Sequence, residues 1–278
     1  MRPVTLLVAA ALALSACTAD EPDPDAGDKP SASSTPTATP APPPAAPALG
    51  ACYRLSYDEA LAPTNSDTAA SCDKGHTSQT FAIGRLDLVA NGHLLAVDSD
   101  AVRKQVANRC PAQLAAYVGA TPEQLRLSLL RPVWFTPTIE ESDAGADWYR
   151  CDVIAVTGDK TLAKFDHNLS GALAKPPGRA EFAMCGTAEP GTEAFSRVLC
   201  RDDHTWQAIR VLDLADRAKN GGYPGEGVVQ EAGQDVCAEA AREIAADALD
   251  YEWGYEWPTK DQWQAGQTYG RCWSPDPA

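Results

Sequence analysis

Two stretches of the chain decide the fold: PTIEESDAGADWYRC at residues 137–151 and PTKDQWQAGQTYGRC at residues 258–272. Aligned without gaps, they share six identities, and fourteen positions separate the proline from the cysteine in both. Repeated spacing of this kind is typical of two copies of one structural module. We therefore predict a first module over residues 51–175 and a second over residues 183–275.

A second pattern lies further from these stretches and supports the same division. Cys72 and His76 are separated by three residues, as are Cys200 and His204, and a threonine follows each histidine. Two of the four histidines thus occupy equivalent places. The order of cysteine and histidine along the chain therefore repeats together with the closing stretch.

The cysteines form a framework. Eight of them follow residue 50, and an even number in an exported chain indicates disulfides. If each module closes on itself, nine pairings remain. Among these we favour the pairs that join the first two strands of each module, and its helix to its last strand: Cys52–Cys72, Cys110–Cys151, Cys185–Cys200 and Cys237–Cys272.

Each module carries the same predicted elements. The first strand holds a cysteine, the second ends at the Cys/His pattern, and the third covers 80–89 or 205–214. A helix follows, and a loop rich in Trp and Pro leads to a closing strand over 148–156 or 268–273. The expected buried helix faces, from residues spaced by four, are Val102, Val106, Cys110 and Leu114, and Val236, Ala240, Ile244 and Ala248. The fold class is α+β, with a small antiparallel sheet and one main helix per module.

The N-terminus predicts export and a lipid anchor. Residues 1–16 combine Arg2, an apolar run too short to span a bilayer, and small residues before Cys17. The stretch Leu14-Ser15-Ala16-Cys17 resembles the lipobox of bacterial lipoproteins, which implies cleavage before Cys17 and a diacylglyceryl group on its sulfur. Two acyl chains hold a protein on a membrane where one holds it only marginally. The alternative is an ordinary secretory signal with a chance cysteine.

Residues 17–50 are predicted to be a disordered linker. Proline, alanine, serine and threonine fill 24 of the 33 positions from 18 to 50, and no aromatic residue is present. Such a segment buries too little apolar surface to offset its chain entropy. We expect a spacer that holds the folded part away from the membrane, on its extracytoplasmic face.

Charge limits the choice of partners. The chain has 38 acidic and 23 basic side chains, a net charge of −15. A surface this acidic repels phosphate backbones, so we expect no nucleic-acid partner. The expected partners are the membrane, through Cys17, and a cell-wall or envelope protein component.

The second module also resembles a known family. Its Cys-x₃-His pattern, Tyr223-Pro224-Gly225, helical cysteine, Pro-Thr, Trp263 with Gly266, and final Arg-Cys are similar to the septum-formation domain of bacterial membrane proteins and lipoproteins. The resemblance extends over nearly all of residues 51–275. It implies a role in the cell envelope near division, and it implies no known catalytic residue.

The histidines and tryptophans are the candidate binding residues. His76 and His204 have carboxylates nearby in the sequence and could bind a metal or a proton-sensitive partner, but a structural role is the competing interpretation. Because the cysteines are expected to be oxidised, we predict no metal site and no cofactor. Trp253, Trp257 and Trp263 belong to the densest aromatic cluster, which forms either a stacking surface for sugars or peptides or a lid over the second helix.

No sequence motif of a known hydrolase or phosphate-binding loop is present. We therefore expect a membrane-anchored, non-catalytic binding or scaffolding protein of the cell envelope, linked to septum formation. The alternative is an exported hydrolase that uses His76 or His204 with a nearby carboxylate.

Overall fold

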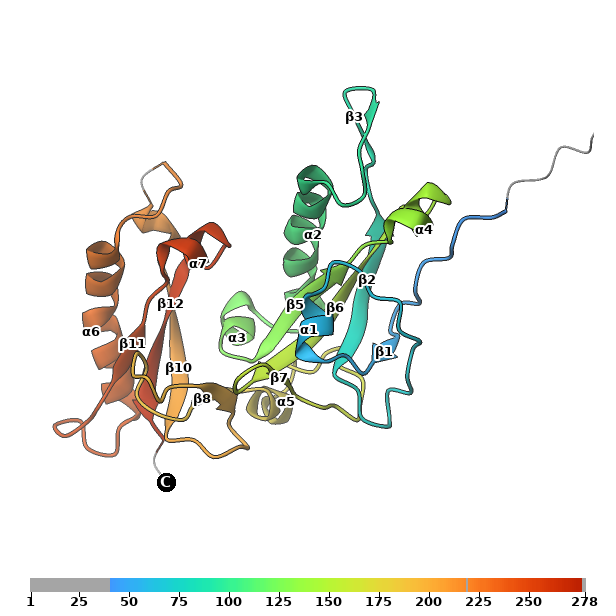
Figure 1. Ribbon diagram of the computed structural model, residues 1–278. Helices are drawn as coiled ribbons and strands as arrows, with labels where there is room; N and C mark the ends of the chain where they lie inside the picture. The colour runs from blue at the N-terminus through green and yellow to red at the C-terminus, as the bar shows by residue number, and fades with distance from the viewer. Residues whose placement is uncertain (1–40, 219, 277–278) are drawn as a thin grey trace, which may run out of the picture. The chain divides into compact units, whose positions relative to one another are not determined.

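The first sheet has five antiparallel strands. In the computed structural model, which describes residues 41–218 and 220–276, they are β1 (Cys52–Tyr53), β2 (Ser78–Arg85), β5 (Leu130–Phe135), β6 (Trp148–Thr157) and β7 (Thr161–Leu162). Their order is β1-β2-β6-β5, and β7 pairs with the end of β6. The helix α2 (Asp100–Val118) packs on one face of this sheet (Figure 1).

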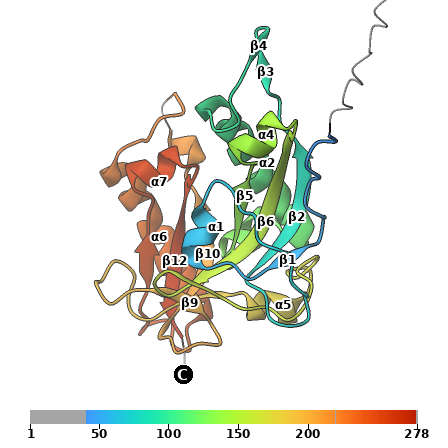
Figure 2. The ribbon, with the colours of Figure 1, turned by 45° about the vertical axis from the view of Figure 1, so that its right-hand side comes forward.

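The second sheet is also antiparallel and five-stranded. Its strands are β8 (Met184–Gly186), β9 (Arg197–Leu199), β10 (Trp206–Asp213), β11 (Gly254–Glu256) and β12 (Tyr269–Pro275). They are ordered β11-β12-β10-β8-β9, and the helix α6 (Glu226–Ile244) packs against β12, β10 and β11 (Figure 2). The fold is therefore mixed α/β with antiparallel sheets.

Short elements connect these layers: α1 (Tyr57–Leu61), α3 (Pro122–Arg126), α4 (Ile139–Asp143), α5 (Pro176–Glu181), η1 (Ala215–Arg217), α7 (Lys260–Gln264) and the hairpin of β3 (Val89–Ala90) and β4 (His93–Leu94). The threonines of the two Pro-Thr pairs, Thr138 and Thr259, begin α4 and α7 with capping boxes. A capping box satisfies backbone N–H groups that a helix leaves free at its start.

All four disulfides have the pairing favoured from the sequence. Cys52 bonds Cys72, and Cys185 bonds Cys200, near the start of each sheet. Cys110 of α2 bonds Cys151 of β6, and Cys237 of α6 bonds Cys272 of β12, so each main helix is linked to the closing strand of its sheet.

The buried face of α2 is as predicted, but that of α6 is not. Val102, Val106, Cys110 and Leu114 are fully buried. In α6, Ile244 is 58% exposed, and Ala248 lies beyond the end of the helix. The buried side chains of α6 are instead Val229, Gly233, Cys237, Ala240 and Ala241. The disulfide to Cys272 turns Cys237 to the centre of the buried face, which moves the predicted stripe off it.

Two further expectations differ from the structure. The stretch around Trp134, predicted to be a loop, is strand β5. It lies at the edge of its sheet, where Pro132 removes no hydrogen bond from a central ladder. Residues 41–50, assigned to the linker, belong to the folded unit, and Gly50 N donates to Thr80 O at 3.0 Å.

The two sheets share their largest apolar core. Buried side chains on the α2 side of the first sheet form one cluster with Met184, Leu199 and Trp273 of the second sheet. A smaller cluster, around Tyr53 and Phe135, covers the other face of the first sheet. The signal sequence, Cys17 and the linker up to residue 40 lie outside the described residues. None of the helices described here has the length and apolar character that a membrane span requires.

Candidate functional site

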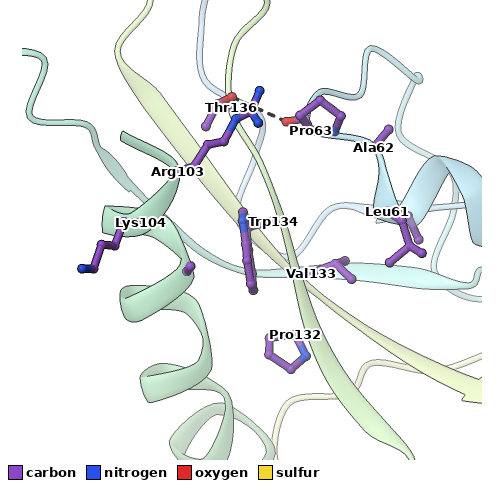
Figure 3. A pocket seen from close by; sticks show the side chains of 11 residues that line it. Leu61, Ala62, Pro63, Arg103, Lys104, Pro132, Val133, Trp134 and Thr136 are labelled. Atoms are coloured by element: carbon purple, nitrogen blue, oxygen red, sulfur yellow. Dashed lines mark hydrogen bonds between the residues drawn. The ribbon is translucent and has the colours of Figure 1, made fainter. Parts of the chain in front are cut away.

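A hollow of about 520 Å³ runs beside the edge strand β5 (Figure 3). We call it the β5 groove. Its volume lies within the range of about 300–1,000 Å³ that is usual for ligand pockets. It is lined by Ala60, Leu61, Ala62, Pro63, Arg103, Lys104, Ala107, Pro132, Val133, Trp134 and Thr136.

Trp134 stands between the α2 side of the β5 groove and its α1 side. The indole is half-buried, so part of its face is free to contact a ligand. Leu61, the last residue of α1, is 58% exposed in the same groove. A half-buried indole beside an exposed leucine is suited to an apolar or aromatic group.

Two cations border the β5 groove on the side of α2. Arg103 and Lys104 are both exposed, and Figure 3 shows their side chains beyond Trp134. On the opposite side, Thr136 N donates to Pro63 O at 3.0 Å and holds the loop after α1 against β5. The groove therefore combines an apolar wall with a positively charged rim, which favours a ligand that carries both apolar and acidic groups.

The first histidine predicted as a binding residue is buried. His76 has no exposed surface, its ring meets the ring of Phe165 edge-on at 5.7 Å, and its backbone pairs with that of Phe165. Burial lowers the pKa of His76 below 6.5. Neither ring nitrogen has a hydrogen-bond partner within the described residues. The ring is thus an apolar filler of the core, and a metal or substrate in solvent does not reach it.

The second histidine is near the surface, but both of its nitrogens are occupied. Nδ1 of His204 lies 2.7 Å from Asp202 O, and Nε2 lies 2.9 Å from Oδ2 of Asp276. The sulfurs of Cys185 and Cys200 are within 4.8 Å of the ring, a grouping that metal ligands could have. Because these sulfurs form a disulfide, they are not the thiolates that bind metals.

The predicted aromatic cluster is divided between core and surface. Trp263 is buried against Leu214 and Val229, and its ring meets that of Tyr223 edge-on at 5.8 Å. Tyr255 is buried under α6, where its hydroxyl donates to Val229 O at 3.0 Å, and burial raises its pKa to about 12. Trp253 and Trp257 are half-buried against the same cluster. The cluster is therefore largely a lid over the second helix, as the structural interpretation expected.

The structure also contains a buried ion pair that the sequence analysis did not find. Nε of Arg150 lies 3.1 Å from Oδ1 of Asp152, and the guanidinium stacks on the rings of Tyr53 and Phe135 at 4.0 and 4.4 Å. Asp152 accepts hydrogen bonds from Ser78 and Thr80, yet burial raises the pKa of its carboxyl. The alternation of Arg150 and Asp152 in a closing strand was the only available signal.

Comparison with known proteins gives one match. The family described as Septum formation matches residues 133–272, about half of the chain. The matched stretch begins in β5 and ends at Cys272, and it includes Trp134. No curated protein and no solved structure matches the chain.

Proposed function

This chain belongs to the Septum formation family, and from that premise we propose that it is a non-catalytic binding protein that acts on the outer face of the membrane during cell division. The family match, which extends over half of the chain, is the observation that carries this proposal. The places of the two histidines agree with a role without catalysis. His76 is buried, and the ring of His204 is held by the turn around it.

The protein is held on the membrane by lipid. The support is the sequence Leu14-Ser15-Ala16-Cys17 after a short apolar run. The linker then separates the anchor from the folded unit, which begins near residue 41. A tether of this length lets the folded unit search for partners at a distance from the bilayer surface.

The folded unit consists of two copies of one module. Strand order supports this, because β1-β2-β6-β5 corresponds to β8-β10-β12-β11. The third strand of each copy has a register shift opposite the closing cysteine, between Thr80 and Ala82 and between Ala208 and Arg210. The turns after the capping boxes match as well, with Gly145 at φ 95° and Gly266 at φ 96°.

The β5 groove is the surface that docks the partner. The apolar wall and the positive rim favour an apolar segment of an envelope protein that carries carboxylates. Leu61 is the residue to test, because it is exposed and its side chain lines this groove. Placing a carboxylate there would repel an acidic partner and desolvate poorly against an apolar one.

The test is the location of the full-length protein, fused at its C-terminus to a fluorescent protein, in the cells that encode it. We expect it to concentrate at the division septum, and we expect Leu61→Asp to spread evenly over the membrane. Leu249→Asp, at a leucine 97% exposed and outside the groove, is the matched control and should keep the septal pattern. Cys17→Ala should leave the membrane altogether.

Each part of the proposal has an outcome that contradicts it. Even distribution of the unaltered protein would exclude a role at the septum. Septal enrichment of Leu61→Asp would exclude the β5 groove as the docking surface. Membrane retention of Cys17→Ala would exclude the lipid anchor.

A further inference from the structure

Four arginines gather between the two sheets. Arg126 ends α3, Arg131 lies in β5, Arg197 begins β9, and Arg271 lies in β12. They line a hollow of about 640 Å³, and a second hollow of about 500 Å³ adjoins it through Arg131 and Arg197. We call the larger hollow the arginine cleft.

The arginine cleft has too few carboxylates for its guanidinium groups. Arg197 and Arg271 pair with the same carboxylate, Glu256, and Nη1 of Arg271 lies 3.4 Å from it. Arg131 has no ion pair within the described residues, and its Nη1 donates to the carbonyls of Ser128 and Leu130 at 2.9 and 2.7 Å. Arg126 is separately neutralised by Asp213 at 3.2 Å.

Two positive charges therefore remain uncompensated, in a chain whose net charge is −15. Burial, followed by the charge of Arg271, lowers the pKa of Arg131 and of Arg197 to about 10. Nε of Arg197 is buried and has no hydrogen-bond partner within the described residues. Like charges held this close, with an unused donor, favour an anion in the cleft.

The first sheet shows how an arginine at the same strand position is neutralised without a ligand. Arg150 precedes Cys151 as Arg271 precedes Cys272. Asp152 follows in the first strand and pairs with Arg150 at 3.1 Å, whereas Trp273 follows Cys272 in the second. The second closing strand thus keeps the guanidinium and lacks the adjacent carboxylate.

We propose that the arginine cleft binds a phosphate monoester, with the phosphate on Arg131, Arg197 and Arg271 and the organic group against Trp134 and Tyr269. A phosphate monoester carries about −1.5 to −2 charges at pH 7, which matches the two uncompensated positive charges. Guanidinium groups bind phosphate through paired N–H donors. Trp134 and Tyr269 line the same hollow.

The experiment is isothermal titration calorimetry of the full-length protein in detergent, with phenyl phosphate, inorganic phosphate and phenylacetate as separate probes. We expect phenyl phosphate to bind most tightly of the three. Arg131→Gln and Arg197→Gln should each weaken that binding by about tenfold or more, because each removes a charged hydrogen-bond donor. Arg85→Gln, at an exposed arginine outside the cleft, is the matched control and should bind as the unaltered protein does.

Melting temperatures separate lost binding from lost folding. Without ligand, Arg131→Gln should melt at the same temperature as the unaltered protein or higher, because it removes a like-charge contact. Absence of phenyl phosphate binding, unchanged binding in both cleft variants, or a lower melting temperature of Arg131→Gln would overturn the proposal. Tighter binding of phenylacetate would refute the doubly charged ligand. Equal binding of inorganic phosphate would refute the contact with Trp134 and Tyr269.

Discussion

His76 shows how a residue can recur for a structural reason. Its distance from Cys72 matches that of His204 from Cys200, which from the sequence alone suggested a functional pair. In the structure His76 fills the core beside Phe165, whereas His204 bonds Asp202 and Asp276. The common spacing places both rings next to a disulfide, and their chemical environments differ.

Burial of His76 predicts a loss of stability in mild acid. Its pKa in the folded protein is lowered below 6.5, so the unfolded chain binds a proton that the folded chain refuses. The stabilisation is complete above about pH 6.5 and is lost as the pH falls through the folded pKa. For one proton the slope is at most about 1.4 kcal/mol per pH unit. We expect the melting temperature of the unaltered protein to drop between pH 7.5 and 5.5 more than that of His76→Phe.

The control for this prediction is His93→Phe, because His93 is exposed in the β4 hairpin. That variant should keep the pH dependence of the unaltered protein. If His76→Phe and the unaltered protein show parallel melting curves over this pH range, His76 does not carry the acid sensitivity.

Gly233 sets the distance between α6 and the second sheet. A Cβ at this position would lie 2.1 Å from the ring of Tyr255, so the helix can approach β11 only with glycine there. Tyr255 is in turn held by its hydrogen bond to Val229 O. The helix therefore packs through small residues, and its larger apolar side chains lie to one side.

We predict opposite effects for two glycine substitutions in this one helix. Gly233→Ala should lower the free energy of unfolding by about 1–3 kcal/mol, because the overpacked methyl displaces Tyr255 or α6. Gly227→Ala should raise it by about 0.5–1 kcal/mol, because alanine favours the helix and the added methyl meets nothing within 4 Å. Urea unfolding at constant pH measures both values. Equal effects in the two variants would show that helix propensity, and not contact with Tyr255, decides the outcome.

At the scale of the whole molecule, the stretch matched by the family is smaller than the folding unit. Residues 133–272 include β6 but not β2, which pairs with six residues of β6. They include Cys151 but not its partner Cys110. The shared core also needs α2, which lies before the matched stretch.

A chain of residues 133–278 is therefore expected not to fold by itself. Cys151 should react with a thiol reagent, and thermal unfolding followed by circular dichroism should show no cooperative transition. A chain of residues 41–278 should unfold cooperatively, with none of its eight cysteines reactive before reduction. Cooperative unfolding of the shorter chain would mean that the second sheet and its helix form an independent domain.

Local spacing was sufficient for much of this fold. The four disulfide pairs, the α2 face and the two closing strands followed from patterns within one element or between neighbouring ones. The α6 face could not be predicted in the same way, because small residues pack there and a hydrophobic pattern does not register glycine. Strand β5 was missed because Pro132 and Trp134 suggested a loop.

By itself, the sequence determined the repeated cysteine framework, the α+β class and the resemblance to the septum-formation domain, because each of these rests on order and spacing along the chain. Only the tertiary structure decided which side chains meet. Arg131, Arg197 and Arg271 are brought together by the packing of one sheet against the other. The same packing determines which arginines lack a carboxylate, since charge balance in a cleft depends on distance in space.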